Sequence, residues 1–249
     1  MTNLINKTTD ATDAKDKPQA SEVRQIFDRI APVYDQLNDW LSLGQHRVWK
    51  KMAVNWAQPQ PGDKFLDLCC GSGDVAMLLA KRVAPAGKVI GVDFACEQLA
   101  IAAERTCELP PPIGNCLIWQ EGDALDLPFA DRYFDGATIA YGLRNVTNIS
   151  KCLAELQRVL KPGAIAAILD FNRTENPIAA KFQQFYLDHI VVPIAKNQGM
   201  EAEYAYIMPS LERFPLDKEQ VQLGLAAGFT QAKHYAIANT LMGVLVLTK

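Results

Sequence analysis

Four aspartates and a glycine turn are the residues of this sequence best suited to bind a ligand. Asp67, Asp74, Asp93 and Asp123 lie at or next to the ends of three apolar segments, and Gly71-Ser72-Gly73 lies between the first two. Glycines at alternate positions let the backbone turn sharply and approach a ligand closely. An aspartate about 20 residues after such a turn can hold the hydroxyl pair of a ribose. The spacing predicts a pocket for a cofactor that carries adenosine.

The charge beside the turn indicates which adenosine cofactor fits. The run from Gly71 to Ala76 satisfies the dinucleotide pattern G-x-G-x-x-G/A, which is a weak signal by itself. A pyrophosphate is anionic, so Asp67 and Asp74 would repel it. S-adenosylmethionine has no phosphate, and nearby carboxylates stabilise both its sulfonium and its ammonium group. The sequence therefore favours S-adenosylmethionine over NAD.

The end of the third apolar segment supplies the predicted adenine contacts. The Asp123 carboxylate can accept a hydrogen bond from the adenine amino group, while the amide of Ala124 contacts the ring. Any one of these aspartates is also explained as a helix N-cap or a turn former, but four at successive strand ends favour a cofactor site. The predicted cofactor-binding residues are Asp67, Gly71, Ser72, Gly73, Asp74, Asp93, Phe94, Asp123 and Ala124.

Length, charge and cysteine use restrict the class of protein. The 249 residues suit one α/β domain, and a net charge of -3 with mixed signs gives no electrostatic footprint for nucleic acid. The six cysteines show neither C-x-x-C nor Cys/His ligand spacing, so we expect reduced thiols and no metal site. For the adjacent Cys69 and Cys70 we expect apolar packing rather than a strained disulfide. No segment approaches the ~20 apolar residues of a membrane span.

The chain divides into three parts by composition. Residues 1–20 are polar, and we expect a disordered tail that is neither a signal nor a transit peptide. Residues 21–60 contain two amphipathic helical patterns and are predicted to form a helical lid segment. Residues 61–249 are predicted to form the cofactor-binding domain, with residues 171–228 giving it substrate specificity. These features predict a cytoplasmic protein.

Seven strand-like segments predict the architecture of that domain. Five of them, at 64–68, 88–93, 116–121, 134–140 and 163–170, alternate with helical segments, and Leu160–Gly163 is expected to be the turn into the fifth. This rhythm predicts right-handed crossovers and a parallel sheet. Only Asn239-Thr240 separates the last two segments, 231–238 and 241–248, so they must form an antiparallel hairpin. We therefore predict an α/β fold: a doubly wound, mostly parallel, seven-stranded sheet with a C-terminal antiparallel hairpin.

Several longer motifs carry a resemblance to a known family. They are Tyr34-Asp35-x-x-Asn38-x-x-x-Ser42-x-Gly44 with Trp49, the loop Asp67–Asp74, Gly122-Asp123-Ala124-x-x-Leu127-Pro128-Phe129, Gly142-Leu143-Arg144-Asn145-Val146 and Arg158-Val159-Leu160-Lys161-Pro162-Gly163. From about residue 21 onward the chain resembles the ubiquinone/menaquinone biosynthesis C-methyltransferase family. The double cysteine and Leu169-Asp170-Phe171-Asn172 bring it nearest the plant and cyanobacterial branch. The resemblance implies the class I S-adenosylmethionine-dependent methyltransferase fold.

The resemblance also implies a reaction and a substrate. A methyl group would pass from S-adenosylmethionine to a ring carbon of a reduced prenylated naphthoquinol, most closely the precursor of phylloquinone. Alternative substrates are a demethylmenaquinone or a ubiquinone precursor, and an NAD-dependent oxidoreductase is the disfavoured alternative from another class. A lipid substrate implies transient peripheral contact with a membrane, and the sequence leaves a homodimer open.

Four residues are predicted to serve the catalytic step. Arg144 and Asn145 follow the fourth predicted strand, where ligands bind in such folds, and Arg144 could stabilise a substrate phenolate. The alternatives are a salt bridge for Arg144 and a helix cap for Asn145. Tyr34 could close over the site from the lid segment, or anchor that segment by packing. His46 has a suitable pKa for proton transfer, although a surface or capping histidine is a common outcome.

Overall fold

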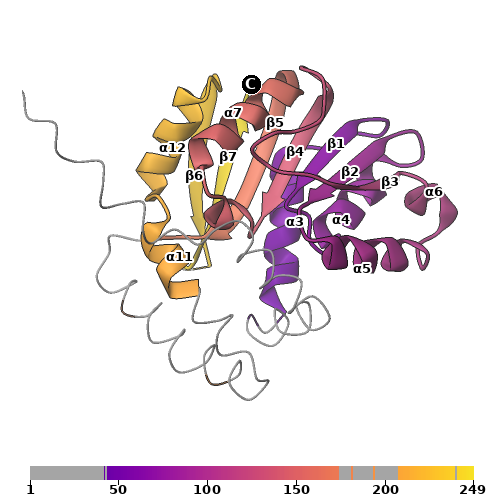
Figure 1. Cartoon of the computed structure of the whole chain (residues 1–249), viewed down its shortest axis with the longest axis horizontal. Helices are drawn as coiled ribbons and strands as arrows, with labels where there is room; N and C mark the ends of the chain where they lie inside the picture. The colour runs from indigo at the N-terminus through magenta and orange to yellow at the C-terminus, as the bar shows by residue number, and fades with distance from the viewer. Residues whose placement is uncertain (1–41, 43, 174–180, 182–192, 194–206, 239) are drawn as a thin grey trace, which may run out of the picture.

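A seven-stranded sheet organises the chain (Figure 1). The protein is described from a computed structural model, in which residues 42, 44–173, 181, 193, 207–238 and 240–249 are described. The strands are β1 (Lys64–Leu68), β2 (Lys88–Asp93), β3 (Leu117–Glu121), β4 (Phe134–Ala140), β5 (Leu160–Phe171), β6 (Gln231–Ile237) and β7 (Met242–Thr248). The helices are α3 (Gln45–Ala57), α4 (Asp74–Val83), α5 (Cys96–Thr106), α6 (Pro111–Gly114), α7 (Ile149–Val159), α11 (Ile207–Arg213) and α12 (Asp217–Ala226), with the 3-10 turn η2 (Leu143–Asn145).

The strand order is that of a doubly wound sheet with a reversed strand near one edge. The order is β3-β2-β1-β4-β5-β7-β6, in which β7 runs antiparallel to both β5 and β6 and the other neighbours are parallel. The predicted sheet and its closing hairpin are therefore confirmed. Of the described helices, none is both long and apolar enough to cross a membrane.

The start of β5 differs from the prediction. Leu160 already pairs with Phe134 of β4, and a register shift between Phe134 and Gly136 lets the pairing resume at Ile165. The predicted turn therefore lies within β5. Gly163 has a φ of 80°, so the backbone bends there without leaving the strand. At β3 the difference is one residue, since the strand begins at Leu117 rather than at 116.

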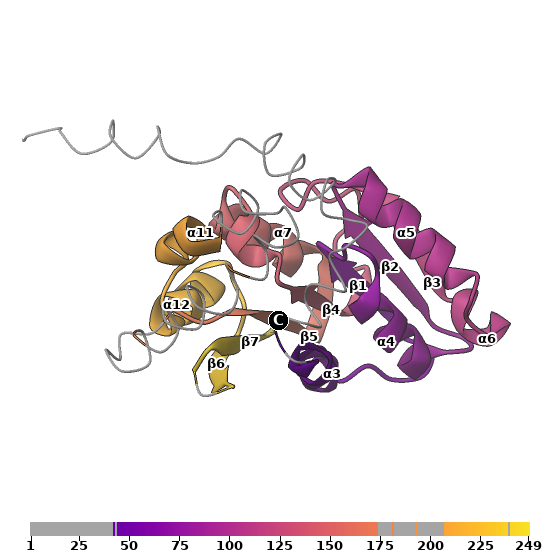
Figure 2. The same cartoon turned by 90° about the horizontal axis from the view of Figure 1, so that it is seen from below.

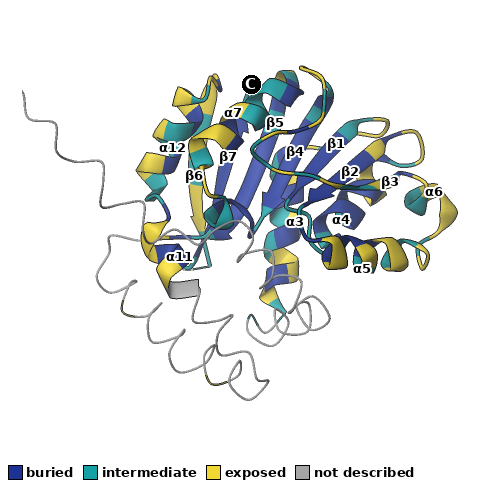
Figure 3. Cartoon of the chain, in the orientation of Figure 1, coloured by how far each residue is buried: buried dark blue, intermediate teal, exposed yellow. Residues whose placement is uncertain are grey.

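Alternate strand residues build two separate cores. Phe65 and Val89 pack with α3 and α4 on one face of the sheet, while Leu66 and Ile90 pack with α7 on the other. Figure 2 shows these helices on the two sides of the sheet, and Figure 3 shows that the strands between them are buried. Because helices cover both faces of the sheet, the parallel strands have apolar residues at nearly every position in the sequence.

The strand order also fixes where a ligand can bind. From β1 the chain crosses to β2 on one side and later enters β4 on the other, so the loops after β1 and β4 diverge. In open α/β sheets this divergence leaves a crevice at the carboxyl ends of the strands. Helix α3 contacts β4, β5 and α4, which brings a residue of the predicted lid segment to this crevice. Residues 1–41 of the predicted tail and lid lie outside the described residues.

Candidate active site

A cavity of about 430 Å³ lies at the carboxyl ends of the parallel strands. Its walls come from the segments that follow β1, β2, β3 and β4, together with Lys50 of α3. Eight of the nine predicted cofactor-binding residues line it: Asp67, Gly71, Ser72, Asp74, Asp93, Phe94, Asp123 and Ala124. Pockets for small-molecule ligands typically measure about 300–1,000 Å³, so this cavity is of the expected size.

Gly73 is the predicted residue that does not line the cavity. It precedes α4 with a φ of 87°, and a Cβ atom built on it would lie 2.4 Å from Cη2 of Trp119. The indole of Trp119 is held there because its Nε1 donates to Thr106 Oγ1 at 3.0 Å. Gly73 was expected to let the backbone approach a ligand closely. It instead lets the backbone approach the indole of Trp119. Gly71 keeps a left-handed φ of 52° on the cavity wall.

Asp93, at the end of β2, is fixed by two backbone donors. Its Oδ2 accepts from Gly71 N at 2.8 Å and its Oδ1 accepts from Ala95 N at 3.0 Å. The residue is 7% exposed. A carboxylate has about four acceptor sites, so it can bind several donors at once. The arrangement suits a ribose hydroxyl pair and also ties the glycine turn to β2.

Asp67, near the end of β1, carries an unsatisfied oxygen. Its Oδ1 accepts from Thr138 Oγ1 at 2.7 Å, whereas its Oδ2 is buried without a hydrogen-bond partner among the described residues. Burial raises the pKa of this carboxyl to about 7. An unpaired acceptor in a cavity wall is suited to a cationic donor such as an ammonium group. The residue therefore fits the methionine end of S-adenosylmethionine.

Asp74 corrects the electrostatic prediction. Its two oxygens bind Lys50 Nζ at 2.7 Å and Arg105 Nη2 at 2.5 Å. Burial alone would raise the pKa of this carboxyl, but the two cations hold it down at about 2. Its negative charge is thus already neutralised, so Asp74 does not present the free charge that was expected to repel a pyrophosphate or attract a sulfonium. It joins α3, α4 and α5 instead.

The sequence prediction missed Lys50 and Arg105. They lie 24 residues before and 31 residues after Asp74, so no local spacing joins them. One feature of the sequence could have pointed to Lys50. It lies on the buried face of α3 with His46 and Ala53, and lysine is rarely buried unless it is paired. Lys50 lines the cavity, and its ammonium group is paired with Asp74.

The two residues that were predicted to contact adenine lie where the sequence placed them. Asp123 and Ala124 both line the cavity, next to Phe94 after β2. Asp123 is exposed, and its Oδ1 accepts from Leu125 N at 2.9 Å, so it is also the turn former that was the alternative explanation. Its second oxygen leaves room for a further donor. Binding of adenine by these residues stays a prediction.

The adjacent cysteines are free and point in different directions. A Cβ atom on Gly142 would lie 2.3 Å from Cβ of Cys69, whereas a Cβ atom on Gly91 would lie 3.0 Å from Sγ of Cys70. Burial raises the pKa of both thiols well above the usual value. Neither is an activated nucleophile, and the predicted packing role is confirmed. Among the described residues, no cluster of His, Cys, Asp and Glu is arranged to hold a metal.

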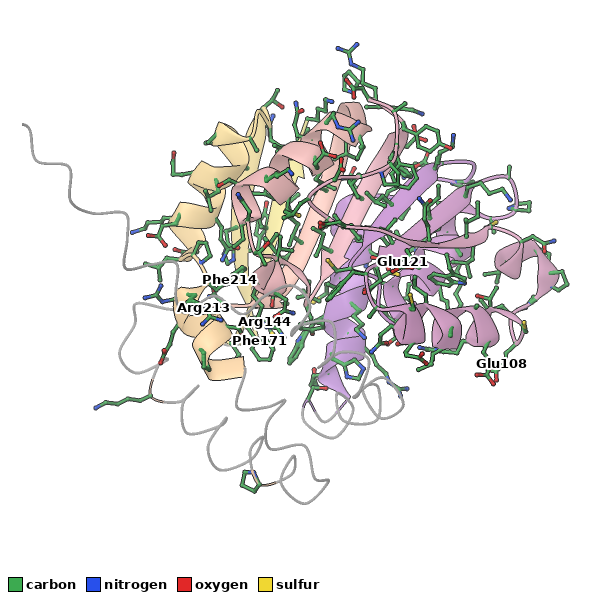
Figure 4. The ribbon with its side chains drawn as sticks, viewed as in Figure 1. Glu108, Glu121, Arg144, Phe171, Arg213 and Phe214 are labelled. Atoms are coloured by element: carbon green, nitrogen blue, oxygen red, sulfur yellow. The ribbon has the colours of Figure 1, made fainter. Side chains whose placement is uncertain are left out.

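Arg144 forms the salt bridge that the sequence left open as its alternative role. Its Nη1 lies 2.5 Å from Asp170 Oδ1 and donates to Tyr141 O at 2.9 Å, and its guanidinium lies 5.0 Å from the centre of the Phe171 ring. Figure 4 shows Arg144 and Phe171 side by side at this end of the sheet. Arg144 does not line the described cavity. Its contact with a phenolate stays a prediction.

Asn145 lines the cavity and does not cap a helix. Its Nδ2 donates to Tyr141 O at 3.1 Å, at the end of η2. The cap of α7 is Asn148, whose Oδ1 accepts from Lys151 N at 3.0 Å. The alternative that assigned Asn145 to a helix cap is therefore wrong, because α7 begins at Ile149, four residues after η2 ends. Asn145 is the predicted catalytic residue that the structure places in the cavity wall.

The other two catalytic candidates are less directly placed. His46 is 4% exposed, and its Nδ1 lies 2.8 Å from Ser42 Oγ. It lies one turn before Lys50 on α3 and does not line the described cavity, and its burial excludes the alternative of a surface histidine. Tyr34 lies outside the described residues. A proton-transfer role for either residue stays a prediction.

Comparison with known proteins identifies the family. The ubiE/COQ5 methyltransferase family matches residues 11–248. The chain belongs to this family. A relative from Trichormus variabilis, named 2-phytyl-1,4-naphtoquinone methyltransferase, is 59% identical over 230 residues, which are 92% of this chain and 99% of the relative. A chloroplastic 2-phytyl-1,4-beta-naphthoquinone methyltransferase from Arabidopsis thaliana is 48% identical over 91% of this chain and 87% of its own length.

Solved structures share the fold. A SAM-dependent methyltransferase from Thermotoga maritima has a TM-score of 0.63 at 19% identity, covering 90% of this chain and 99% of that one. One from Aquifex aeolicus has a TM-score of 0.57 at 19% identity, covering 80% and 88%. The predicted class I methyltransferase fold is confirmed. The family assignment also decides between the two explanations of the glycine turn: this ubiE/COQ5 family member is a methyltransferase.

Proposed function

We propose that this chain transfers a methyl group from S-adenosylmethionine to a ring carbon of reduced 2-phytyl-1,4-naphthoquinone, the last step of phylloquinone biosynthesis. The proposed substrate rests on the names of two relatives, which are 59% and 48% identical to this chain over nearly its whole length. A demethylmenaquinone or a ubiquinone precursor is the alternative substrate, since the family as a whole methylates related rings. The tail distinguishes the two naphthoquinols from each other, and the ring distinguishes both from a ubiquinone precursor.

The polar groups of the cavity support S-adenosylmethionine as the donor. Asp93 offers a fixed carboxylate to the ribose hydroxyls, and Asp67 offers a buried oxygen to the ammonium group. Phe94 and Ala124 are left to contact the adenine.

The chemistry of the ring requires the reduced substrate. The bound cofactor supplies an electrophilic methyl group, so the accepting carbon must be rich in electrons. The carbonyls of a quinone withdraw density from that carbon, whereas the hydroxyls of a quinol, above all as a phenolate, donate density to it. A carbon–carbon bond forms to the methyl, and the ring proton then leaves to restore aromaticity. The protein must hold the ring oxygen and stabilise its developing charge.

Asn145 and Arg144 are the residues proposed for that task. Asn145 lines the cavity, and Arg144 lies next to it in the chain with its guanidinium held by Asp170. A fixed cation close to the ring oxygen would lower the energy of a phenolate. Tyr34, from the segment before α3, and His46, in the first turn of α3, are proposed to contribute.

A lipid substrate gives the proposal a cellular setting. We propose a cytoplasmic protein that contacts the membrane transiently while it takes up the quinol, with the region 171–228 holding the isoprenoid tail. Apolar contacts would supply this association, and a homodimer is compatible with it.

Product analysis tests the proposal. The enzyme is incubated anaerobically with labelled S-adenosylmethionine and reduced demethylnaphthoquinones that bear a phytyl, a short prenyl or a long prenyl tail, and the products are identified by mass spectrometry. The phytyl substrate should gain one methyl group on the ring carbon next to the hydroxyl. Equal methylation of all three would leave the ring chemistry intact but overturn the phytyl assignment, and no methylation of any would overturn the reaction.

A further inference from the structure

The glycine turn of the cofactor site is attached to β2 in its first half. Cys70 N donates to the carbonyl oxygen of Val92 at 3.1 Å, and Gly71 N donates to Asp93 Oδ2 at 2.8 Å. These two bonds fix the start of the turn against the strand that carries the predicted ribose contact. The second half of the turn has a different support.

Arg105, in the last turn of α5, holds that second half. Its Nη1 donates to the carbonyl oxygen of Ser72 at 2.9 Å and to Ser72 Oγ at 3.1 Å, and its Nη2 lies 2.5 Å from Asp74 Oδ1. One planar guanidinium thus reaches acceptors on both sides of Gly73. Ser72 is 4% exposed and lines the cavity, whereas Arg105 does not line it. Arg105 therefore acts on a ligand through the turn that it holds.

The turn needs such a support because of its glycines. Gly71 has a φ of 52° and Gly73 a φ of 87°, and glycine loses more conformational freedom on becoming fixed than any other residue. If the turn is not held in the ligand-free protein, the ligand must order it. The apparent affinity then falls in proportion to the fraction of molecules in which the site is formed. A contact made from behind the cavity can therefore raise the affinity for the cofactor.

The planar geometry of the guanidinium distinguishes Arg105 from a simple counter-ion. Asp74 has a second cation, Lys50 Nζ at 2.7 Å, so its charge keeps a partner when Arg105 is replaced. The carbonyl of Ser72 carries no net charge and needs a directed N–H donor. In Arg105→Lys the ammonium is a compact charge on a flexible stem, without the planar fork that reaches Ser72 and Asp74 together.

We propose that Arg105 is a positioning residue of the cofactor site: its guanidinium holds Ser72 and Asp74 so that the glycine turn has its binding conformation before the cofactor arrives. The inference rests on the proposed function in one respect, since it takes S-adenosylmethionine as the ligand of the cavity. It assigns no chemical step to Arg105. The effect is therefore on cofactor binding and not on methyl transfer.

Calorimetry with S-adenosylhomocysteine and steady-state kinetics test the inference. Arg105→Met keeps a long side chain and removes the donors, and it should weaken S-adenosylhomocysteine binding about 10- to 30-fold. The KM for S-adenosylmethionine should rise by a similar factor. At saturating S-adenosylmethionine, kcat and the KM for reduced 2-phytyl-1,4-naphthoquinone should stay within about twofold of wild type. Arg105→Lys should bind within about threefold of Arg105→Met.

Hydrogen–deuterium exchange gives a readout that a merely structural arginine would not change. The segment Cys70–Asp74 should exchange faster in ligand-free Arg105→Met than in wild type, and it should regain slow exchange at saturating S-adenosylhomocysteine. Arg82→Met is the matched control, because Arg82 lies in the last turn of α4, donates to Asn55 Oδ1 at 2.7 Å and does not line the cavity. It should match wild type in affinity and in exchange of the turn.

The outcomes separate this inference from the proposed function. Wild-type affinity for S-adenosylhomocysteine in folded Arg105→Met would overturn the inference and leave the proposed function standing. A lower kcat at saturating cofactor with unchanged KM would also overturn it, and so would full recovery in Arg105→Lys, which would reduce Arg105 to a counter-ion of Asp74. Arg105→Lys keeps the charge, so it carries the comparison with wild type if Arg105→Met does not fold. Failure of the wild-type protein to bind S-adenosylhomocysteine would overturn both the inference and the proposed function.

Discussion

The substitution Asp67→Asn should make the protein more stable above pH 7 and should weaken cofactor binding. The pKa of Asp67 rises from 3.8 to about 7 on folding because the carboxyl is buried. Between those two values the unfolded chain releases the proton while the folded protein keeps it, so stability falls as the pH rises through this window. A shift of about three pKa units corresponds to about 4 kcal/mol, fully lost above pH 7.

Asparagine is neutral at every pH, so the variant does not lose this stability as the pH rises. Its Oδ1 can still accept from Thr138 Oγ1, but its buried NH₂ group would lack an acceptor, which costs about 1–3 kcal/mol. The net gain in free energy of unfolding at pH 8 is therefore about 1–3 kcal/mol, and it should shrink or reverse at pH 5. Affinity for S-adenosylmethionine should drop, because the ammonium group loses its anionic partner.

Urea denaturation of both proteins at pH 5 and pH 8, without cofactor, measures the effect. The difference in free energy of unfolding between variant and wild type should rise by about 2–3 kcal/mol across this range and stay flat above pH 8. Parallel pH profiles for the two proteins would refute the claim that a buried, ionisable Asp67 is held for the cofactor. Calorimetry with S-adenosylmethionine supplies the second readout.

Three further predictions concern the cofactor, the ion pair and the membrane. Asp93→Ala should weaken S-adenosylmethionine binding by roughly 1.5–3 kcal/mol, the range for hydrogen bonds to a charged group. Undiminished affinity in calorimetry would contradict the assignment of Asp93 to the ribose. Arg144→Ala leaves Asp170 buried without its ion-pair partner and should lower the free energy of unfolding by about 3–5 kcal/mol, with turnover falling more than cofactor affinity in the folded fraction. Wild-type turnover in that variant would remove Arg144 from the mechanism. Flotation with liposomes should give weak association at both low and high salt, and tight binding abolished by salt would point to an electrostatic anchor.

The sheet could be predicted because its signals are local. Apolar runs of strand length, separated by helical segments, place β1, β2 and β4 at their observed bounds, and the two-residue gap before Leu241 fixes the hairpin. The start of β5 could not be predicted, because the proline and glycine at 162–163 read as a turn. The pairing of Leu160 with Phe134 and the hydrogen bond from Gly163 N to Lys249 O hold that segment in the sheet.

The cavity wall could be predicted in composition but not in charge. Backbone position alone puts Asp67 and Asp93 at the carboxyl ends of their strands, so their place followed from the topology. The state of Asp74 depends on Lys50 and Arg105, which reach it from two other helices. The same holds for Gly73, since Trp119 comes to it from β3. Contacts between distant segments leave no spacing in the sequence.

The central claim is that the enzyme methylates the quinol ring and not the quinone. The most direct measurement is the initial rate of methyl transfer from labelled S-adenosylmethionine to demethylphylloquinone under strictly anaerobic conditions, with and without dithionite. The account predicts label in the ring only when dithionite is present, because the oxidised ring carbon is not a competent nucleophile toward a sulfonium methyl. Equal rates on the two redox forms would contradict it.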